Sequence, residues 1–116
     1  MTLRQATDVR LDELDRDVLQ RAEDFIHGAV HCWSKNHPGE WFSVSALLGG
    51  GHRHWDGTPL QALHDRHVSS GQSDAAAFEA AAADAGRLLL DVLSRDARDF
   101  DSDKSQPGGV RYRWVH

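Results

Sequence analysis

The sequence predicts an α+β fold in which helices pack on a small three-stranded antiparallel sheet. Two long segments, 9–35 and 74–96, repeat apolar residues every three or four positions, as amphipathic helices do. The C-terminal segment alternates apolar and basic residues from 110 to 115, as a half-buried strand does. A short aromatic and β-branched segment at 40–44 supplies the third strand.

The first long helix is expected over residues 9–35. Thr7 and Asp8 are suitable N-cap residues, because their side chains can accept hydrogen bonds from the first turn. Pro38 and Gly39 follow the segment and end it in a turn. Its apolar stripe consists of Leu11, Leu14, Val18, Ala22, Phe25, Ile26, Ala29 and Trp33.

Shorter elements are expected in the middle of the chain. After the strand at 40–44, Ser45 is expected to cap one helical turn at 46–48, which the following glycines end. Thr58, followed directly by a proline, is a strong signal for the start of a helix that reaches residue 67.

The second long helix and a β-hairpin complete the chain. Ser73 is expected to cap the helix 74–96, and Gly86 in its middle indicates a close helix crossing. Strands at 98–102 and 110–115, joined by a glycine-rich loop, predict a hairpin that spans 98–115. We expect one apolar face and one basic face, because Arg111 and Arg113 alternate with apolar residues.

The element order of helix, strand, helix, helix and hairpin resembles that of a winged helix, so the fold class is winged-helix-like. In a winged helix the first strand joins the hairpin, and the helix before the hairpin reads DNA. The spacing differs from the usual pattern, because the stretch 49–71 is long and the helix 74–96 exceeds a typical recognition helix. An α+β domain unrelated to DNA-binding proteins explains the same element order.

Length and charge restrict the classes of function. The chain has 116 residues, and we expect residues 1–116 to form a single domain. The formal net charge of −5 disfavours binding of nucleic acid through bulk charge. No apolar run suits a membrane helix, and the first residues lack the apolar core of a secretory signal. We therefore expect a protein that does not enter membranes. The single cysteine, Cys32, excludes an internal disulfide, which favours a cytoplasmic location.

Basic residues of the last helix and the hairpin are the candidate nucleic-acid contacts. On a winged helix they would meet phosphates and give salt-dependent affinity. Interleaved aspartates would repel phosphates, so the alternative is a solvated or protein-contacting surface on which arginine and aspartate pair. The candidate contacts are Arg87, Arg95, Arg98, Lys104, Arg111 and Arg113, and the aspartates are Asp91, Asp96, Asp99, Asp101 and Asp103.

Histidine pairs are weak candidates for a metal site. Residues three or four apart share one face of a helix, as zinc ligands on a helix can. The chain has no HExxH and no CxxC motif, so no metal site is predicted, and no other motif indicates a cofactor. The candidate pairs are His27 with His31 and His64 with His67.

The segment that follows Gly49 offers a second candidate binding site. The three glycines of residues 49–51 lack the lysine and hydroxyl residue of a phosphate-binding loop. Four bulky residues that can form hydrogen bonds then follow on a constrained loop. These residues are His52, Arg53, His54 and Trp55.

No combination of residues makes a convincing catalytic site. Cys32 and His31 are adjacent on a predicted helix and therefore do not face each other. We accordingly expect a non-enzymatic binding module whose partner is DNA or another protein, with self-association into a homo-oligomer as one form of the latter. Trp41, Trp55 and Trp114 cannot all be buried in so small a core, which favours protein contact.

Overall fold

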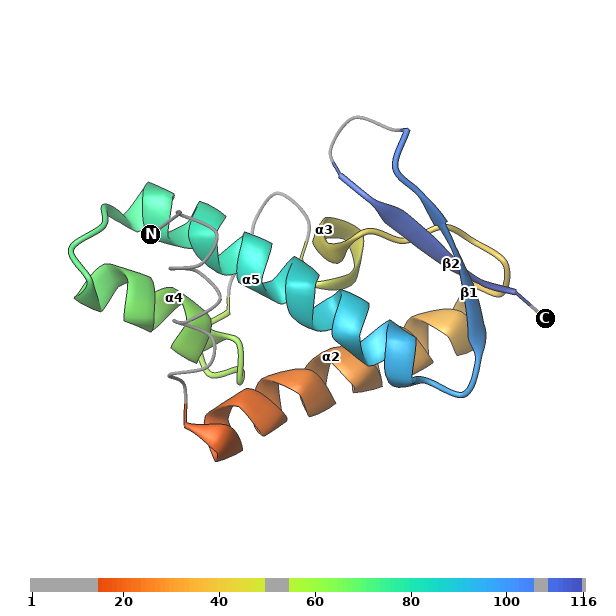
Figure 1. The fold of residues 1–116 in the computed structure, drawn as a ribbon, viewed down its shortest axis with the longest axis horizontal. Coiled ribbons are helices and arrows are strands. Elements are labelled where there is room, and N and C mark those ends of the chain that lie inside the picture. The colour runs from red at the N-terminus through yellow and green to blue at the C-terminus, as the bar shows by residue number, and fades with distance from the viewer. Residues whose placement is uncertain (1–14, 50–54, 106–108, 116) are drawn as a thin grey trace.

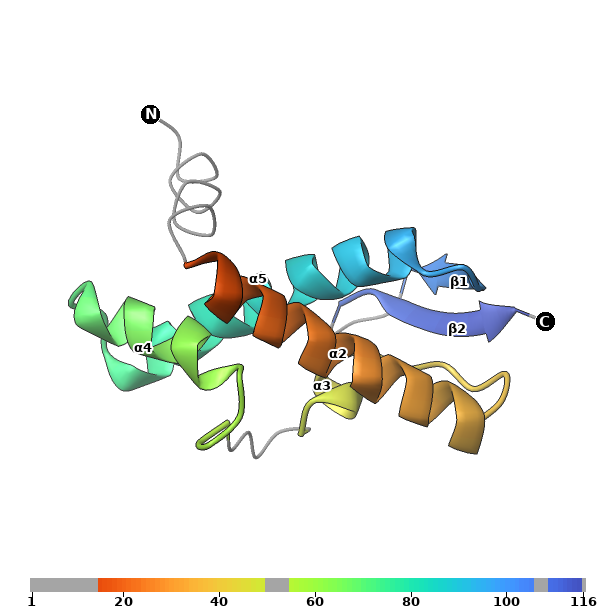
Figure 2. The same ribbon diagram turned by 90° about the horizontal axis from the view of Figure 1, so that it is seen from below.

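Residues 15–49, 55–105 and 109–115 are described in the structure, which is a computed structural model (Figure 1). They form four helices and a two-stranded antiparallel sheet, so the fold is α+β as predicted. Helix α5, Asp74–Arg95, is central and contacts α2, α3 and α4. Two perpendicular views place α4 and the hairpin at opposite ends of α5, with α2 crossing between them (Figures 1 and 2).

Helix α2, Arg16–Asn36, begins later than the sequence predicts. The carboxylate of Asp15 accepts a 2.8 Å hydrogen bond from the Asp17 backbone, so Asp15 is the N-cap, and a continuous helix over 9–35 is wrong. The helix ends before Pro38 as expected. The expected caps, which lie outside the described residues, are Thr7 and Asp8.

The expected strand at 40–44 is reduced to one isolated bridge between Phe42 and Tyr112. The two residues exchange N–H···O bonds of 2.7 and 2.8 Å. The pairing goes no further because the Ser43 side chain caps α3, Val44–Leu47, by accepting from the Ala46 backbone. The cap of this short helix is therefore Ser43 and not Ser45.

Helix α4, Gln61–Ser69, begins two residues after Pro59. The Thr58 hydroxyl accepts from the Leu60 backbone and donates to the Trp55 carbonyl, which organises the turn before the helix. The Ser73 hydroxyl caps α5 as predicted, by accepting from the Ala76 backbone. Local sequence signals therefore locate the start of α5 accurately, and that of α4 within two residues.

The hairpin joins β1, Asp99–Asp103, to β2, Arg111–Val115. Its register pairs Phe100 with Trp114 and Ser102 with Tyr112, so these four side chains share one face. The other face was expected to be basic. It carries three aspartates beside two arginines, because β1 contributes Asp99, Asp101 and Asp103 opposite Arg111, Arg113 and Val115.

The core lies between α5 and the elements that cover it. Most of its members are aliphatic residues and alanines that allow the helices to approach closely. Trp55 is buried, with its indole N–H donating to the Leu48 carbonyl at 3.1 Å, whereas Trp41 and Trp114 are only half-buried. Two polar side chains, His67 and Asp84, lie within the same interior.

Candidate functional site

A groove of about 780 Å³ lies between α3, α5 and the start of β2. It forms because α3 turns away from β2 after Ser43, while small residues keep the α5 wall low. A methyl group on Gly86 would meet Val44 at 3.6 Å, an ordinary contact, so glycine keeps space open here without being sterically required. The groove is lined by Val44, Ala82, Ala83, Gly86, Leu90 and Val110, among others. Its volume matches that of pockets that hold small ligands or peptide side chains.

Two lining residues of the groove have properties that suit a ligand. Leu90 on α5 keeps 53% of its surface exposed, the highest value among the large apolar side chains of the described residues, and it lines the groove. Tyr112 is only 8% exposed and lines the groove on its β2 side. Burial raises the pKa of the Tyr112 phenol, so at neutral pH it remains a protonated donor. The groove thus combines mostly apolar walls with a protonated tyrosine.

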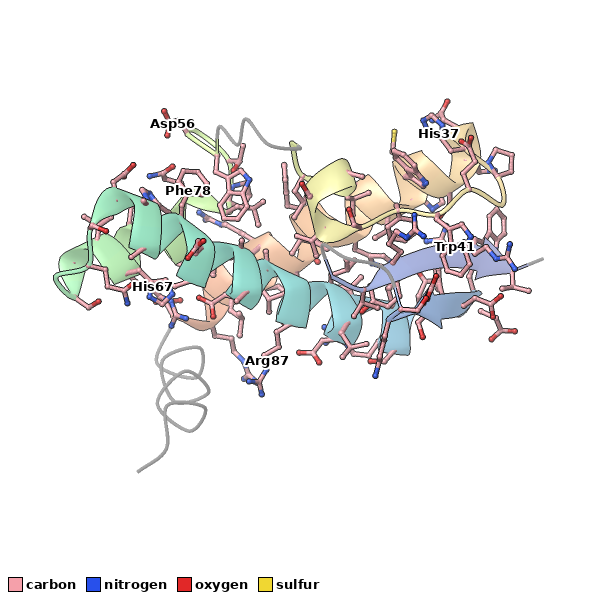
Figure 3. All side chains as sticks on the ribbon, turned by 90° about the horizontal axis from the view of Figure 1, so that it is seen from above. His37, Trp41, Asp56, His67, Phe78 and Arg87 are labelled. Atoms are coloured by element: carbon pink, nitrogen blue, oxygen red, sulfur yellow. The ribbon has the colours of Figure 1, made fainter. Side chains whose placement is uncertain are left out.

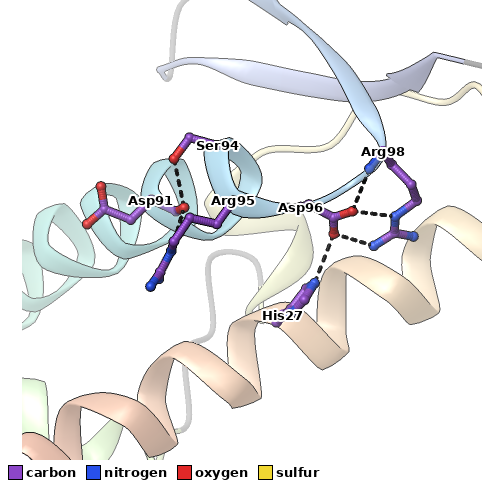
Figure 4. A network of polar contacts seen from close by, with 6 residues as sticks. All are labelled: His27, Asp91, Ser94, Arg95, Asp96 and Arg98. Carbon is purple, nitrogen blue, oxygen red and sulfur yellow. Dashed lines mark hydrogen bonds and ion pairs between the residues drawn. The ribbon is translucent and has the colours of Figure 1, made fainter.

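Arg98, one of the candidate nucleic-acid contacts, lies in an internal network at the end of α5 (Figure 4). Its guanidinium donates to both carboxylate oxygens of Asp96 at 3.0 and 2.7 Å, and His27 on α2 contacts the same carboxylate at 2.9 Å. The rings of Phe100 and Trp114 lie 5.5 and 5.6 Å from the guanidinium carbon. Arg98 therefore joins α5, α2 and the hairpin.

The Asp96 carboxylate has a strongly lowered pKa. Hydrogen bonds from the Arg98 side chain are the main cause, and those from the Arg98 backbone and His27 add to it, against the opposing effect of burial. Because the folded pKa is below the ordinary 3.8, the carboxylate stabilises the fold above that pH and loses this contribution as the pH falls toward the folded value.

Acid unfolding should therefore depend on Asp96. We expect the free energy of unfolding to fall as the pH drops below about 5, and to fall less steeply in Asp96→Asn. Urea unfolding followed by tryptophan fluorescence at several pH values measures both slopes. Parallel curves for the two proteins would show that Asp96 contributes nothing to the acid response.

Three more of the candidate cations lie close to acidic side chains. Arg95 pairs with Glu23 at 2.8 Å, Arg113 approaches Asp101 at 3.3 Å, and Arg111 approaches Asp103 at 3.8 Å. Arg113 also covers the Trp41 ring at 4.7 Å. Lys104 is exposed, and Arg87 extends outward from α5 (Figure 3). Their role in nucleic-acid binding stays a prediction. Carboxylates compete with phosphates for Arg95, Arg98, Arg111 and Arg113.

The histidines of the two candidate metal pairs have separate neighbours. His27 contacts Asp96, and His31 is exposed one turn further along α2. His64 approaches Asp74 at 3.2 Å, while His67 contacts Asp84 at 2.7 Å. Within residues 15–49, 55–105 and 109–115, no three His, Cys, Asp or Glu side chains gather as a metal site requires.

The candidate loop site is only partly described. His52, Arg53 and His54 lie outside the described residues. Trp55 belongs to the core, where its ring lies 5.4 Å from that of Phe78, and it also lines the groove. Trp55 therefore has a structural role that the sequence analysis did not assign.

A buried polar cluster between α4 and α5 was missed by the sequence analysis. One carboxylate oxygen of Asp84 accepts from Arg66 and contacts the His67 ring, both at 2.7 Å. The Asp84 side chain is 1% exposed, and its other oxygen has no hydrogen-bond partner in the part of the chain that the structure describes. The available signal was an acid on the apolar stripe of α5, three residues after Ala81.

Comparisons of the chain with protein-family models, curated proteins and solved structures found no match. Among the helices of the described residues, none is long and apolar enough to cross a lipid bilayer.

Proposed function

We propose that the protein is a non-enzymatic binding module that holds an apolar segment of a partner protein in the groove between α3, α5 and β2. The observation that carries this proposal is the exposure of Leu90, 53% of its surface, in a groove whose lining is mostly apolar. Burying an exposed leucine favours association. An apolar segment that covers Leu90 therefore favours an occupied groove.

Charge also favours a protein partner over nucleic acid. The chain carries a net charge of −5, and the outer face of the hairpin has more carboxylates than guanidinium groups. A surface of this kind does not concentrate phosphates.

The test replaces Leu90 by aspartate. Random peptides of about twelve residues, displayed on phage, are selected on the wild-type chain, and affinities of synthesised peptides are measured by calorimetry. We expect Leu90→Asp to weaken binding at least about tenfold, because a charge replaces an apolar contact. The matched control is Val68→Asp, since Val68 is 43% exposed but lies on α4 outside the groove. Equal affinity of the two variants, or failure to select any peptide, would contradict the proposal.

Duplex DNA is the second candidate partner. The Phe42–Tyr112 bridge supports it, because it places the segment before α3 beside β2, where the first strand of a winged helix adds to the hairpin. The contacts would come from α5 and the hairpin, through Arg87, Lys104, Arg111 and Arg113. A titration with non-specific duplex DNA at about 50 and about 200 mM salt tests this candidate, because phosphate contacts give strongly salt-dependent binding. We expect no binding at either salt concentration.

A further inference from the structure

The edge of β2 that faces the groove has an open backbone position. Tyr112 directs its N–H and C=O to Phe42, and both groups are bonded there. Val110 directly precedes β2. Residues two apart on an extended chain direct these groups to the same edge, so we place the Val110 groups on the edge away from β1. If the antiparallel pairing of Phe42 with Tyr112 continued, Val44 would lie opposite Val110. Val44 is instead the first residue of α3. Among the described residues, no backbone group bonds to Val110.

Val110 lines the same groove as Leu90 and Tyr112. A peptide backbone supplies one donor and one acceptor at each alternate residue, which is what an open strand edge requires. Alternate side chains of such a strand would point toward α5, where Ala83 and Gly86 leave room for apolar groups.

We propose that the partner segment binds as an added β-strand on β2, with its backbone paired to Val110 and its apolar side chains in the groove. This inference rests on the proposed function and specifies its occupant. The added strand would extend the pairing that Phe42 already makes with Tyr112. The net charge of −5 favours a segment in a neutral or basic context, because an acidic one would be repelled.

The experiment uses a peptide that binds the wild-type chain but not Leu90→Asp. Each backbone nitrogen of the peptide is methylated in turn, and the affinity of each derivative is measured. An added strand predicts a loss of about tenfold or more at the one position whose N–H pairs with Val110, with little change at the positions on either side. On the chain, Val110→Pro removes the edge N–H and should weaken binding similarly, while Val110→Ile keeps the backbone and the affinity.

Other methylation patterns overturn the strand mode. Losses at successive positions indicate a bound helix, whose interior N–H groups are all bonded, and losses at none indicate binding by side chains alone. In either case the Leu90→Asp result still supports the groove. If no peptide distinguishes Leu90→Asp from Val68→Asp, the groove proposal fails, and the strand mode fails with it.

Discussion

Replacing Asp84 by alanine should lower the free energy of unfolding by about 3 to 5 kcal/mol, the usual cost of removing one partner from a buried ion pair. Arg66 is only 14% exposed, and two of its guanidinium nitrogens, Nε and Nη1, have no hydrogen-bond partner among the described residues. Without Asp84 the guanidinium would remain buried with no counter-charge. His67, which is 3% exposed, would lose the same carboxylate.

Urea unfolding of the purified variant measures this effect. The control is Asp65→Ala, because Asp65 is an exposed carboxylate of α4 that accepts a hydrogen bond from Gln61 one turn earlier. We expect the control to lose less than about 0.5 kcal/mol. A loss below about 1 kcal/mol in Asp84→Ala would mean that the cluster opens to water or rearranges at little cost.

Phe42→Ala should destabilise the fold by about 3 to 5 kcal/mol, as truncation of a buried aromatic residue typically does. Phe42 is fully buried, and its ring lies 6.1 to 6.3 Å from the rings of Trp33, Phe100 and Tyr112. It therefore joins α2 to both strands of the hairpin. The backbone bonds to Tyr112 need no side chain, so the loss reports packing and not the bridge.

Thermal or urea unfolding compares this variant with Phe25→Ala. Phe25 is 38% exposed on α2, so its truncation creates no enclosed cavity and should cost far less. Equal losses in the two variants would show that the Phe42 ring does not hold the hairpin to the helices.

Elements with local signals were predicted well from the sequence. Ser73 caps α5 in the structure, and the apolar stripe of that helix predicted most of its buried face. The hairpin also forms, with each strand within one residue of its expected bounds. Side-chain caps and apolar periodicity act over a few residues, so they can be recognised without knowing the rest of the fold.

Elements in which side-chain capping competes with the propensity of the segment were predicted poorly. The aromatic segment 40–44 has the composition of a strand, but the Ser43 cap starts α3 and leaves one bridge. The helix expected over 9–35 has a suitable periodicity throughout, yet the Asp15 carboxylate caps α2 at Arg16. In both cases a polar side chain that binds a nearby backbone N–H outweighed the propensity of the segment.

The candidate sites show the same division. The sequence left open whether Arg98, Arg111 and Arg113 meet phosphates or pair with aspartates, and the fold places each beside an aspartate. The sequence did not single out Leu90, and it placed Val110 only within the expected strand 110–115. The groove depends on where α3 leaves β2, which is a contact between segments far apart in the chain.

By itself the sequence determined the class of fold, the central helix α5, the hairpin and the acidic balance of charge, because these follow from composition and local periodicity. Only the tertiary structure decided that Asp84 is buried with Arg66 and His67, that Asp96 holds Arg98, and that the Val110 edge of β2 opens on an apolar groove. Pairing, burial and open edges are relations between distant residues, and their free energies arise when the chain brings those residues together.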